Sequence, residues 1–152
     1  MKLAPLFSAE ITLAAPLEMG VSALGRRRII EITGGRFTGE RLSGKVLPGG
    51  ADWQLVRADG VAYLDTRYTL ETQDGALIYV QNRGYRHGPA EVIERLARGE
   101  MVDPASYYFR TSPWFETSAP EYAWLNRTIF LGSGARLADR VRLEVFEVQC
   151  HA

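Results

Sequence analysis

The sequence predicts an all-β protein, an antiparallel β-barrel of about nine strands with one short helix. Two observations predict this fold class. Glycines that follow aspartate or another glycine recur at short intervals, and the segments between them are rich in Val, Ile, Thr, Tyr and Phe. No series of helical segments alternates with the strands, and a closed barrel removes exposed strand edges most economically. A barrel is therefore expected, with a β-sandwich as the alternative.

Two Asp-Gly pairs define the central strand. Asp59-Gly60 and Asp74-Gly75 suit hairpin turns, because glycine tolerates positive φ and aspartate tolerates the left-handed region better than most residues. They bracket a strand over residues 61–72. Further turns are expected at Gly34-Gly35, Gly49-Gly50 and Gly132-Ser133-Gly134. The resulting strands, in chain order, are residues 3–13, 27–33, 36–47, 52–57, 61–72, 76–83, 107–117, 128–131 and 140–149.

One helix is expected between Pro89 and Gly99. Proline fits the first helical position, Glu91 lies in an early turn, Arg98 lies late, and Gly99 ends the helix. A helix this short is marginal unless packing stabilises it. Its apolar stripe is therefore expected to lie against the sheet or to plug one mouth of the barrel.

Length and composition limit the class of protein. The 152 residues fit one domain over residues 1–152, which buries roughly 70% of its unfolded surface without disulfides or metals. Eighteen basic and eighteen acidic side chains give a net charge of zero, and no basic run exceeds Arg26-Arg27-Arg28, so nucleic acid is not an expected partner. A single Cys150 and the lack of an uninterrupted apolar stretch of membrane-spanning length favour a cytoplasmic protein without a membrane partner.

Motifs for nucleotides, metals and covalent catalysis are incomplete. Residues 39–46 have the glycine and lysine spacing of a phosphate-binding loop, but Val46 stands where Ser or Thr must hold magnesium. Residues 132–137 begin like a dinucleotide fingerprint but lack its third glycine. His87 and His151 are far apart in sequence, and neither has a second ligand at metal spacing. Neither a metal nor a cofactor is expected.

One predicted strand carries alternating charges. Asp65 and Arg67 share a face with Thr69, because side chains alternate along a strand with a period of two. If that face points outward, the charges form a solvated ion pair worth roughly 0–1 kcal/mol. If it points inward, the charges need partners, and they become a ligand anchor or a proton-transfer site. On the next strand, Tyr79 is either a core residue or a hydrogen-bond donor to a substrate oxygen.

The segment from Tyr107 to Trp124 concentrates seven aromatic residues around one arginine and one glutamate. Aromatic rings with a guanidinium and a carboxylate can recognise a planar or carboxylated small molecule through stacking and a bidentate clamp. Core packing or a subunit interface explains the same composition equally well, since Tyr, Trp and Arg are favoured at interfaces. The candidate site residues from this segment are Tyr108, Arg110, Trp114, Glu116 and Trp124.

Short motifs in a fixed order point to a known family. The most specific are residues 48–53 (Pro-Gly-Gly-Ala-Asp-Trp) and 108–111 (Tyr-Phe-Arg-Thr), accompanied by residues 64–68 (Leu-Asp-Thr-Arg-Tyr) and 124–126 (Trp-Leu-Asn). Over nearly its whole length the chain resembles the bacterial family known as domain of unknown function 3237. The resemblance implies a compact β-barrel, and it brings no established reaction.

The resemblance also favours particular polar positions as site residues. Those that belong to the family pattern are Asp52, Asp65, Arg67, Arg110 and Asn126. They could instead fix the barrel, since Asp52 could form an Asx turn after Gly50 and Asn126 could cap the turn before the next strand. No catalytic role can be carried over, because the family pattern comes with none.

Three classes of function are compatible with the sequence. The first is a cofactor-independent isomerase, lyase or cyclase that acts on a small aromatic or cyclic carbonyl compound by proton transfer. In that hypothesis Asp65 is the base, Arg67 or Arg110 stabilises an oxyanion, Tyr79 donates a hydrogen bond, and Trp53, Trp114 and Trp124 line the pocket. The second is a non-catalytic barrel that binds a small-molecule ligand. The third is an oligomeric structural module, such as a homodimer, with residues 107–124 in its interface.

Overall fold

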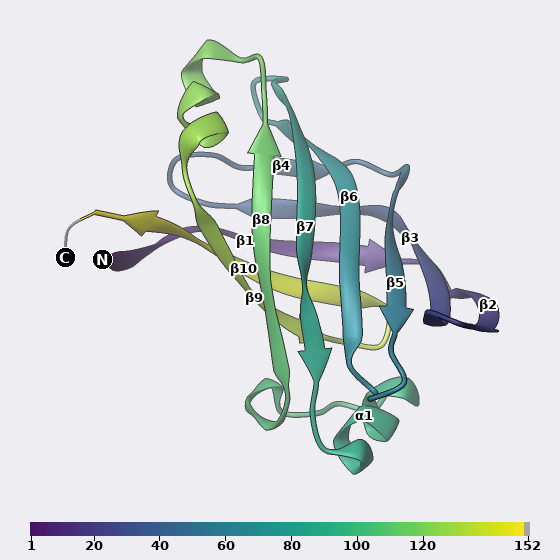
Figure 1. Cartoon of the computed structure of the whole chain (residues 1–152). Helices are drawn as coiled ribbons and strands as arrows, with labels where there is room; N and C mark the ends of the chain where they lie inside the picture. The colour runs from purple at the N-terminus through teal and green to yellow at the C-terminus, as the bar shows by residue number, and fades with distance from the viewer. Residues whose placement is uncertain (151–152) are drawn as a thin grey trace.

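Ten antiparallel strands form a single sheet in the computed structural model, which describes residues 1–150 (Figure 1). In chain order they are β1 (Lys2–Leu13), β2 (Leu17–Ser22), β3 (Gly25–Thr38), β4 (Gly44–Val46), β5 (Gly50–Val56), β6 (Ala62–Thr72), β7 (Leu77–His87), β8 (Tyr108–Glu116), β9 (Phe130–Arg136) and β10 (Arg140–Gln149). The helices among these residues are α1 (Ala90–Ala97) and the short 3-10 helices η1 (Pro104–Ser106) and η2 (Pro120–Arg127). None of them is long and apolar enough to cross a membrane. His151 lies outside the described residues.

The sheet closes into a barrel because β1 pairs with β10 on one side and with β3 on the other. The ring has eight strand positions. β4 and β5 occupy one place in it, since each bridges β3 to β6 over a different part of their length. β2 pairs only with β3 and extends beyond the ring (Figure 1). The predicted antiparallel barrel is therefore confirmed.

Side chains alternate between the interior and the outer face along the barrel strands. In β6, Leu64, Tyr68 and Leu70 are buried, whereas Arg67 is exposed on the opposite face. One end of the interior is filled by an apolar cluster that includes Leu70, Ile78, Val80, Phe115 and Phe130, all at most 2% exposed. That end of the barrel is sealed by packing.

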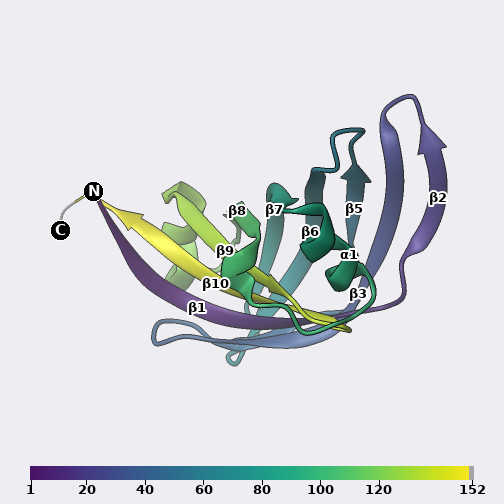
Figure 2. The same ribbon diagram turned by 90° about the horizontal axis from the view of Figure 1, so that it is seen from below.

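Helix α1 lies at the other end of the barrel, at its mouth, which is one of the two positions that the sequence left open. Leu96 is buried there in a second apolar cluster with Leu64, Tyr107 and Phe109. Figure 2 shows the helix between the curved walls of the sheet, close to the ends of β5 and β6. Gly99 follows the helix with φ +77°, a conformation that favours glycine at a helix end. The interior is therefore packed at one end and covered by a short helix at the other.

The two Asp-Gly turns are confirmed. The Gly60 N–H donates to the Arg57 carbonyl oxygen at 2.9 Å, and the Gly75 N–H donates to that of Thr72 at 2.9 Å. Both glycines have φ between +80° and +90°, at +85° and +88°. These turns connect β5 to β6 and β6 to β7, so they bracket the central strand as the sequence predicted.

Two other glycine runs were wrongly predicted as turns. Gly34-Gly35 lies inside β3, and residues 132–134 lie inside β9. A side chain at Gly35 would collide with the Glu10 carbonyl oxygen of β1, and a Cβ at Gly134 would lie 2.6 Å from the Phe109 ring. These glycines therefore permit close approach to neighbouring strands or side chains rather than chain reversal. β2 was also missed: Leu17, Met19 and Val21 alternate along it, but all its residues are exposed, so the strand contributes no buried face.

We expect the Gly134→Ala substitution to destabilise the fold by about 1–3 kcal/mol, since the added methyl group overlaps the Phe109 ring and one of them must move. Urea unfolding measures the change. Ser133→Ala, at the neighbouring position with its side chain on the other face of β9, serves as the control and should alter stability by less than about 0.5 kcal/mol. Equal effects of the two substitutions would contradict the close packing of Phe109 on β9.

Candidate functional site

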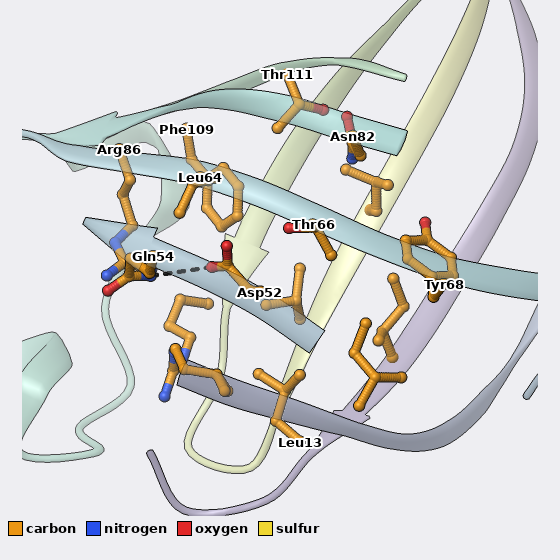
Figure 3. A pocket seen from close by; sticks show the side chains of 16 residues that line it. Leu13, Asp52, Gln54, Leu64, Thr66, Tyr68, Asn82, Arg86, Phe109 and Thr111 are labelled. Atoms are coloured by element: carbon orange, nitrogen blue, oxygen red, sulfur yellow. Dashed lines mark hydrogen bonds between the residues drawn. The ribbon is translucent and has the colours of Figure 1, made fainter. Parts of the chain in front are cut away.

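A cavity of about 50 Å³ lies inside the barrel between the sealed end and α1 (Figure 3). Aliphatic and aromatic side chains form most of its wall. Its polar lining residues are Asp52, Gln54, Thr66, Asn82, Arg86, Thr111 and Arg136. A second hollow of about 80 Å³ is lined by α1 and shares Arg86 and Arg136 with the cavity. These two arginines therefore separate the interior from the mouth.

Asp52 is the acidic residue of this cavity. β5 directs its side chain inward, where the residue is 9% exposed. One carboxylate oxygen accepts a hydrogen bond from the Asp65 backbone N–H at 3.0 Å, and the other accepts one from the Gln54 amide at 3.2 Å. Burial raises the pKa of Asp52, and these hydrogen bonds and the charge of Arg86 oppose the rise. The carboxyl group therefore holds its proton to a higher pH than an ordinary aspartate.

Three arginines lie toward the α1 end of the interior. Arg28 on β3 donates to the Gln54 side-chain oxygen at 3.0 Å and to Glu18 at 3.0 Å. Burial, followed by the charge of Arg136, lowers the pKa of Arg86 to about 10. Burial, followed by the charge of Arg28, also lowers the pKa of Arg136. Guanidinium groups remain charged at neutral pH under such shifts, so the mouth of the cavity is cationic.

Two buried polar atoms facing the cavity lack hydrogen-bond partners among residues 1–150. They are the side-chain oxygens of Asn82 on β7 and Thr111 on β8, which lie close to each other in Figure 3. An unsatisfied buried polar atom costs about 1–3 kcal/mol, and such atoms in native proteins call for an explanation. A ligand with a polar group would provide the missing partner.

Most of the sequence-predicted site residues lie away from this cavity. Asp52 lines it, whereas the others on the barrel strands face outward because they occupy the alternate positions of their strands. The outward-facing residues are Trp53 on β5, Asp65 and Arg67 on β6, Tyr79 on β7, and Tyr108, Arg110, Trp114 and Glu116 on β8.

The outward residues contact one another on the surface. The Asp65 carboxylate lies 3.5 Å from the guanidinium of Arg83 and 4.0 Å from that of Arg67. Of the two orientations that the sequence left open, the outward one is therefore observed, and such exposed pairs contribute little to stability. The Tyr79 hydroxyl accepts a hydrogen bond from Gln81 at 3.0 Å, and its ring meets Trp114 edge-on. The structure does not bring these groups to the cavity.

Trp124 and Asn126 lie in η2, beyond the sealed end of the barrel. The guanidinium of Arg41 lies 3.6 Å from the centre of the Trp124 ring, which packs against the apolar cluster. The Asn126 side chain accepts from the Thr117 N–H at 2.8 Å and donates to the Thr117 carbonyl at 2.9 Å. Both hydrogen bonds hold η2 against the end of β8, which is a structural role other than the cap of the turn before the next strand that the sequence suggested for Asn126.

Several cavity residues were missed from the sequence. They are Gln54, Thr66, Asn82, Arg86, Thr111 and Arg136. A usable signal existed, since Gln54 has the same strand parity as Asp52, and Asn82 and Arg86 have the same parity as the apolar Val80. Polar residues at positions that share a face with buried apolar ones are expected inside a barrel. Within residues 1–150 no group of three or more His, Cys, Asp or Glu side chains could hold a metal ion.

We expect the Asp52→Asn variant to gain stability relative to the wild type as pH rises. Because the folded state raises the pKa of Asp52, the wild type has this proton-linked stability in full below the ordinary pKa of 3.8 and loses it as pH rises through the folded-state pKa. Over the whole pH series, the difference in unfolding free energy between the variant and the wild type should change by about 1.4 kcal/mol for each tenfold by which folding lowers the acid dissociation constant of Asp52. Urea unfolding at a series of pH values measures it, and a pH-independent difference, as expected for Ser133→Ala, would contradict the assignment.

Comparisons with known proteins agree with this architecture. The model of the family described as protein of unknown function (DUF3237) matches residues 1–148. A UPF0311 protein from Rhodopseudomonas palustris strain TIE-1 is 51% identical over 129 residues, which cover 85% of this chain and 84% of its own.

Solved structures share the fold. A β-barrel-like protein from Acinetobacter baumannii AYE is 50% identical, with a TM-score of 0.86 over 97% of this chain and 96% of its own. An enzyme from Penicillium herquei is 24% identical, with a TM-score of 0.74 over 97% of this chain and 94% of its own, and this likeness concerns the fold alone. As the sequence motifs predicted, the chain belongs to the DUF3237 family of proteins of unknown function.

Proposed function

We propose that this barrel binds a small organic molecule in its interior and acts on it by proton transfer, as a cofactor-independent isomerase, lyase or cyclase for a small aromatic or cyclic carbonyl compound. One observation carries the proposal: the buried Asp52 carboxyl, with a raised pKa, lines a largely apolar cavity in the barrel interior. Titratable groups with perturbed pKa values in a cavity are the usual candidates for acid–base catalysis.

The chemistry assigned to Asp52 needs no external reactant. As a carboxylate it takes a proton from an acidic C–H or O–H of the substrate, and as the resulting acid it returns that proton to another substrate atom. No proton is gained or lost overall, as an isomerisation or cyclisation requires. The Arg86 guanidinium and the Thr111 hydroxyl lie in the same wall and would stabilise negative charge that develops on a substrate oxygen.

The proposal replaces Asp65 by Asp52 as the base. The Asp65 carboxylate faces solvent and two arginines, whereas the Asp65 backbone N–H holds the Asp52 carboxylate in place. Asp65 therefore serves the proposed site through its main chain. Arg67, Arg110 and Tyr79, which were expected to assist Asp65, are likewise left outside the proposed site by their outward orientation.

The free volume limits how a substrate would bind. A cavity of about 50 Å³ is smaller than typical ligand pockets of about 300–1,000 Å³. A cyclic substrate would therefore also fill the hollow under α1 and displace the helix or the two arginine side chains. The fold of the Penicillium herquei enzyme supports the idea that a barrel of this shape can house catalysis.

A thermal-shift screen against aromatic acids, cyclic ketones and lactones tests the binding step. A ligand present at 100 times its dissociation constant stabilises the folded state by about 2.7 kcal/mol. Conversion of each hit is then followed by NMR. For a converted compound, Asp52→Asn should reduce turnover at least about 100-fold while the thermal shift persists. Asp65→Asn is the matched control and should leave turnover unchanged. Binding without any conversion would instead indicate a non-catalytic ligand-binding barrel.

A second candidate function, an interface between copies of this chain, is favoured by aromatic residues on the outer face. Trp114 is 50% exposed and Tyr108 is 47% exposed on β8, and Tyr85 on the adjacent β7 is 43% exposed. If the wild type is a dimer by light scattering, Trp114→Ala should dissociate it, while Trp53→Ala on β5 should not. A monomeric wild type would exclude this candidate.

A further inference from the structure

The walls of the cavity and of the hollow under α1 carry more positive than negative charge. Their charged residues are Arg26, Arg28, Arg86, Arg136 and Asp52. On the outside, Glu18 offsets the first two, at 3.9 Å from Arg26 and 3.0 Å from Arg28. Arg86 and Arg136 border both spaces, and the carboxylate whose charge acts on them is that of Asp52.

Neither of these two arginines has a full set of partners among residues 1–150. No carboxylate there lies within 4.0 Å of either guanidinium. Arg136 donates from Nε to the Leu137 carbonyl at 2.9 Å, and Arg86 lies 5.8 Å from the centre of the Phe109 ring. Figure 3 shows Arg86 extending from β7 toward Gln54. Buried charges are stable when they are paired, so the remaining N–H groups have donor capacity for an anion.

We propose that Arg86 and Arg136 form an anion subsite at the α1 end of the cavity, which binds the carboxylate of a small organic acid. This inference rests on the proposed small-molecule function and names its substrate class. Guanidinium groups match carboxylates in shape and can donate two parallel hydrogen bonds. The apolar part of the acid would point inward, toward the aliphatic wall and the polar atoms of Asn82 and Thr111.

The subsite also orients the acid relative to Asp52. Gln54 lies between Arg28 and Asp52, because it accepts from Arg28 at 3.0 Å and donates to Asp52 at 3.2 Å, and Arg86 extends toward the same Gln54 side chain (Figure 3). A carboxylate at the mouth would therefore be kept away from the Asp52 carboxylate, and the carbon atoms next to it would come toward Asp52. The substrate would then be a carboxylic acid with its reactive centre a few atoms from the acid group.

Paired acids and amides test this inference. We would measure thermal shifts of the whole chain with benzoate and benzamide, and with the smaller pair propionate and propionamide, at constant ionic strength. The acid of a pair should stabilise the protein and its amide should not. Arg136→Gln should weaken the acid's apparent affinity at least about tenfold, since a hydrogen bond to a charged group is lost.

Three further variants make the test specific. Arg136→Lys keeps the charge and should retain part of the affinity, while Arg83→Gln on the outer face should leave it unchanged. Arg86→Gln replaces Arg136→Gln if the latter does not fold. Equal shifts by acid and amide, or undiminished affinity in the Gln variants, would overturn the anion subsite and leave the interior binding function intact. If neither the acids, the amides nor any compound of the wider screen stabilises the protein, both the anion subsite and the interior binding function are overturned.

Discussion

The pairing of β1 with both β10 and β3 is the constraint on which the rest of the structure depends. Once the ring is closed, every barrel strand has one face inside and one outside, and the period of two decides which residues meet in the interior. Asp52, Asn82, Arg86, Thr111 and Arg136 come from four different strands, so only closure brings them together. An open sheet of the same strands would leave these groups in water, without the burial that shifts the pKa values of Asp52, Arg86 and Arg136.

One end of the barrel contributes mainly to stability, and the other end contains the groups proposed for chemistry. The sealed end packs large apolar side chains with almost no exposure, and that packing offsets the cost of polar groups elsewhere. The α1 end contains half-buried arginines, a buried acid and two unsatisfied oxygens. A helix of eight residues covers this end, and its few apolar contacts make it the part of the wall that is easiest to displace.

The sequence predicted the architecture better than the site. Hairpin turns, the helix and most strands follow from local chemistry such as the positive φ at Gly60 and Gly75. Asp52 was identified, but Arg86 and Arg136 were not, because the strands expected at residues 76–83 and 128–131 stop short of these two arginines, which the structure places in β7 and β9. The sequence alone left the face of Asp65 undecided, and the burial of Leu64 and Tyr68 shows that Asp65 faces outward. Glycines inside β3 and β9 were misjudged because their function depends on strands far away in sequence.

The side chain of Gln54 links the interior acid to the exterior of the ring. Its amide N–H donates to Asp52 and its oxygen accepts from Arg28, which in turn binds Glu18 on β2. The nitrogen of an amide can only donate and its oxygen can only accept, so these hydrogen bonds fix the orientation of the Gln54 side chain. β2 takes no part in closing the ring, but these hydrogen bonds connect it to the Asp52 carboxyl inside the ring. Sequence change in an exposed hairpin can thus adjust the acidity of a buried group without altering any residue of the cavity wall.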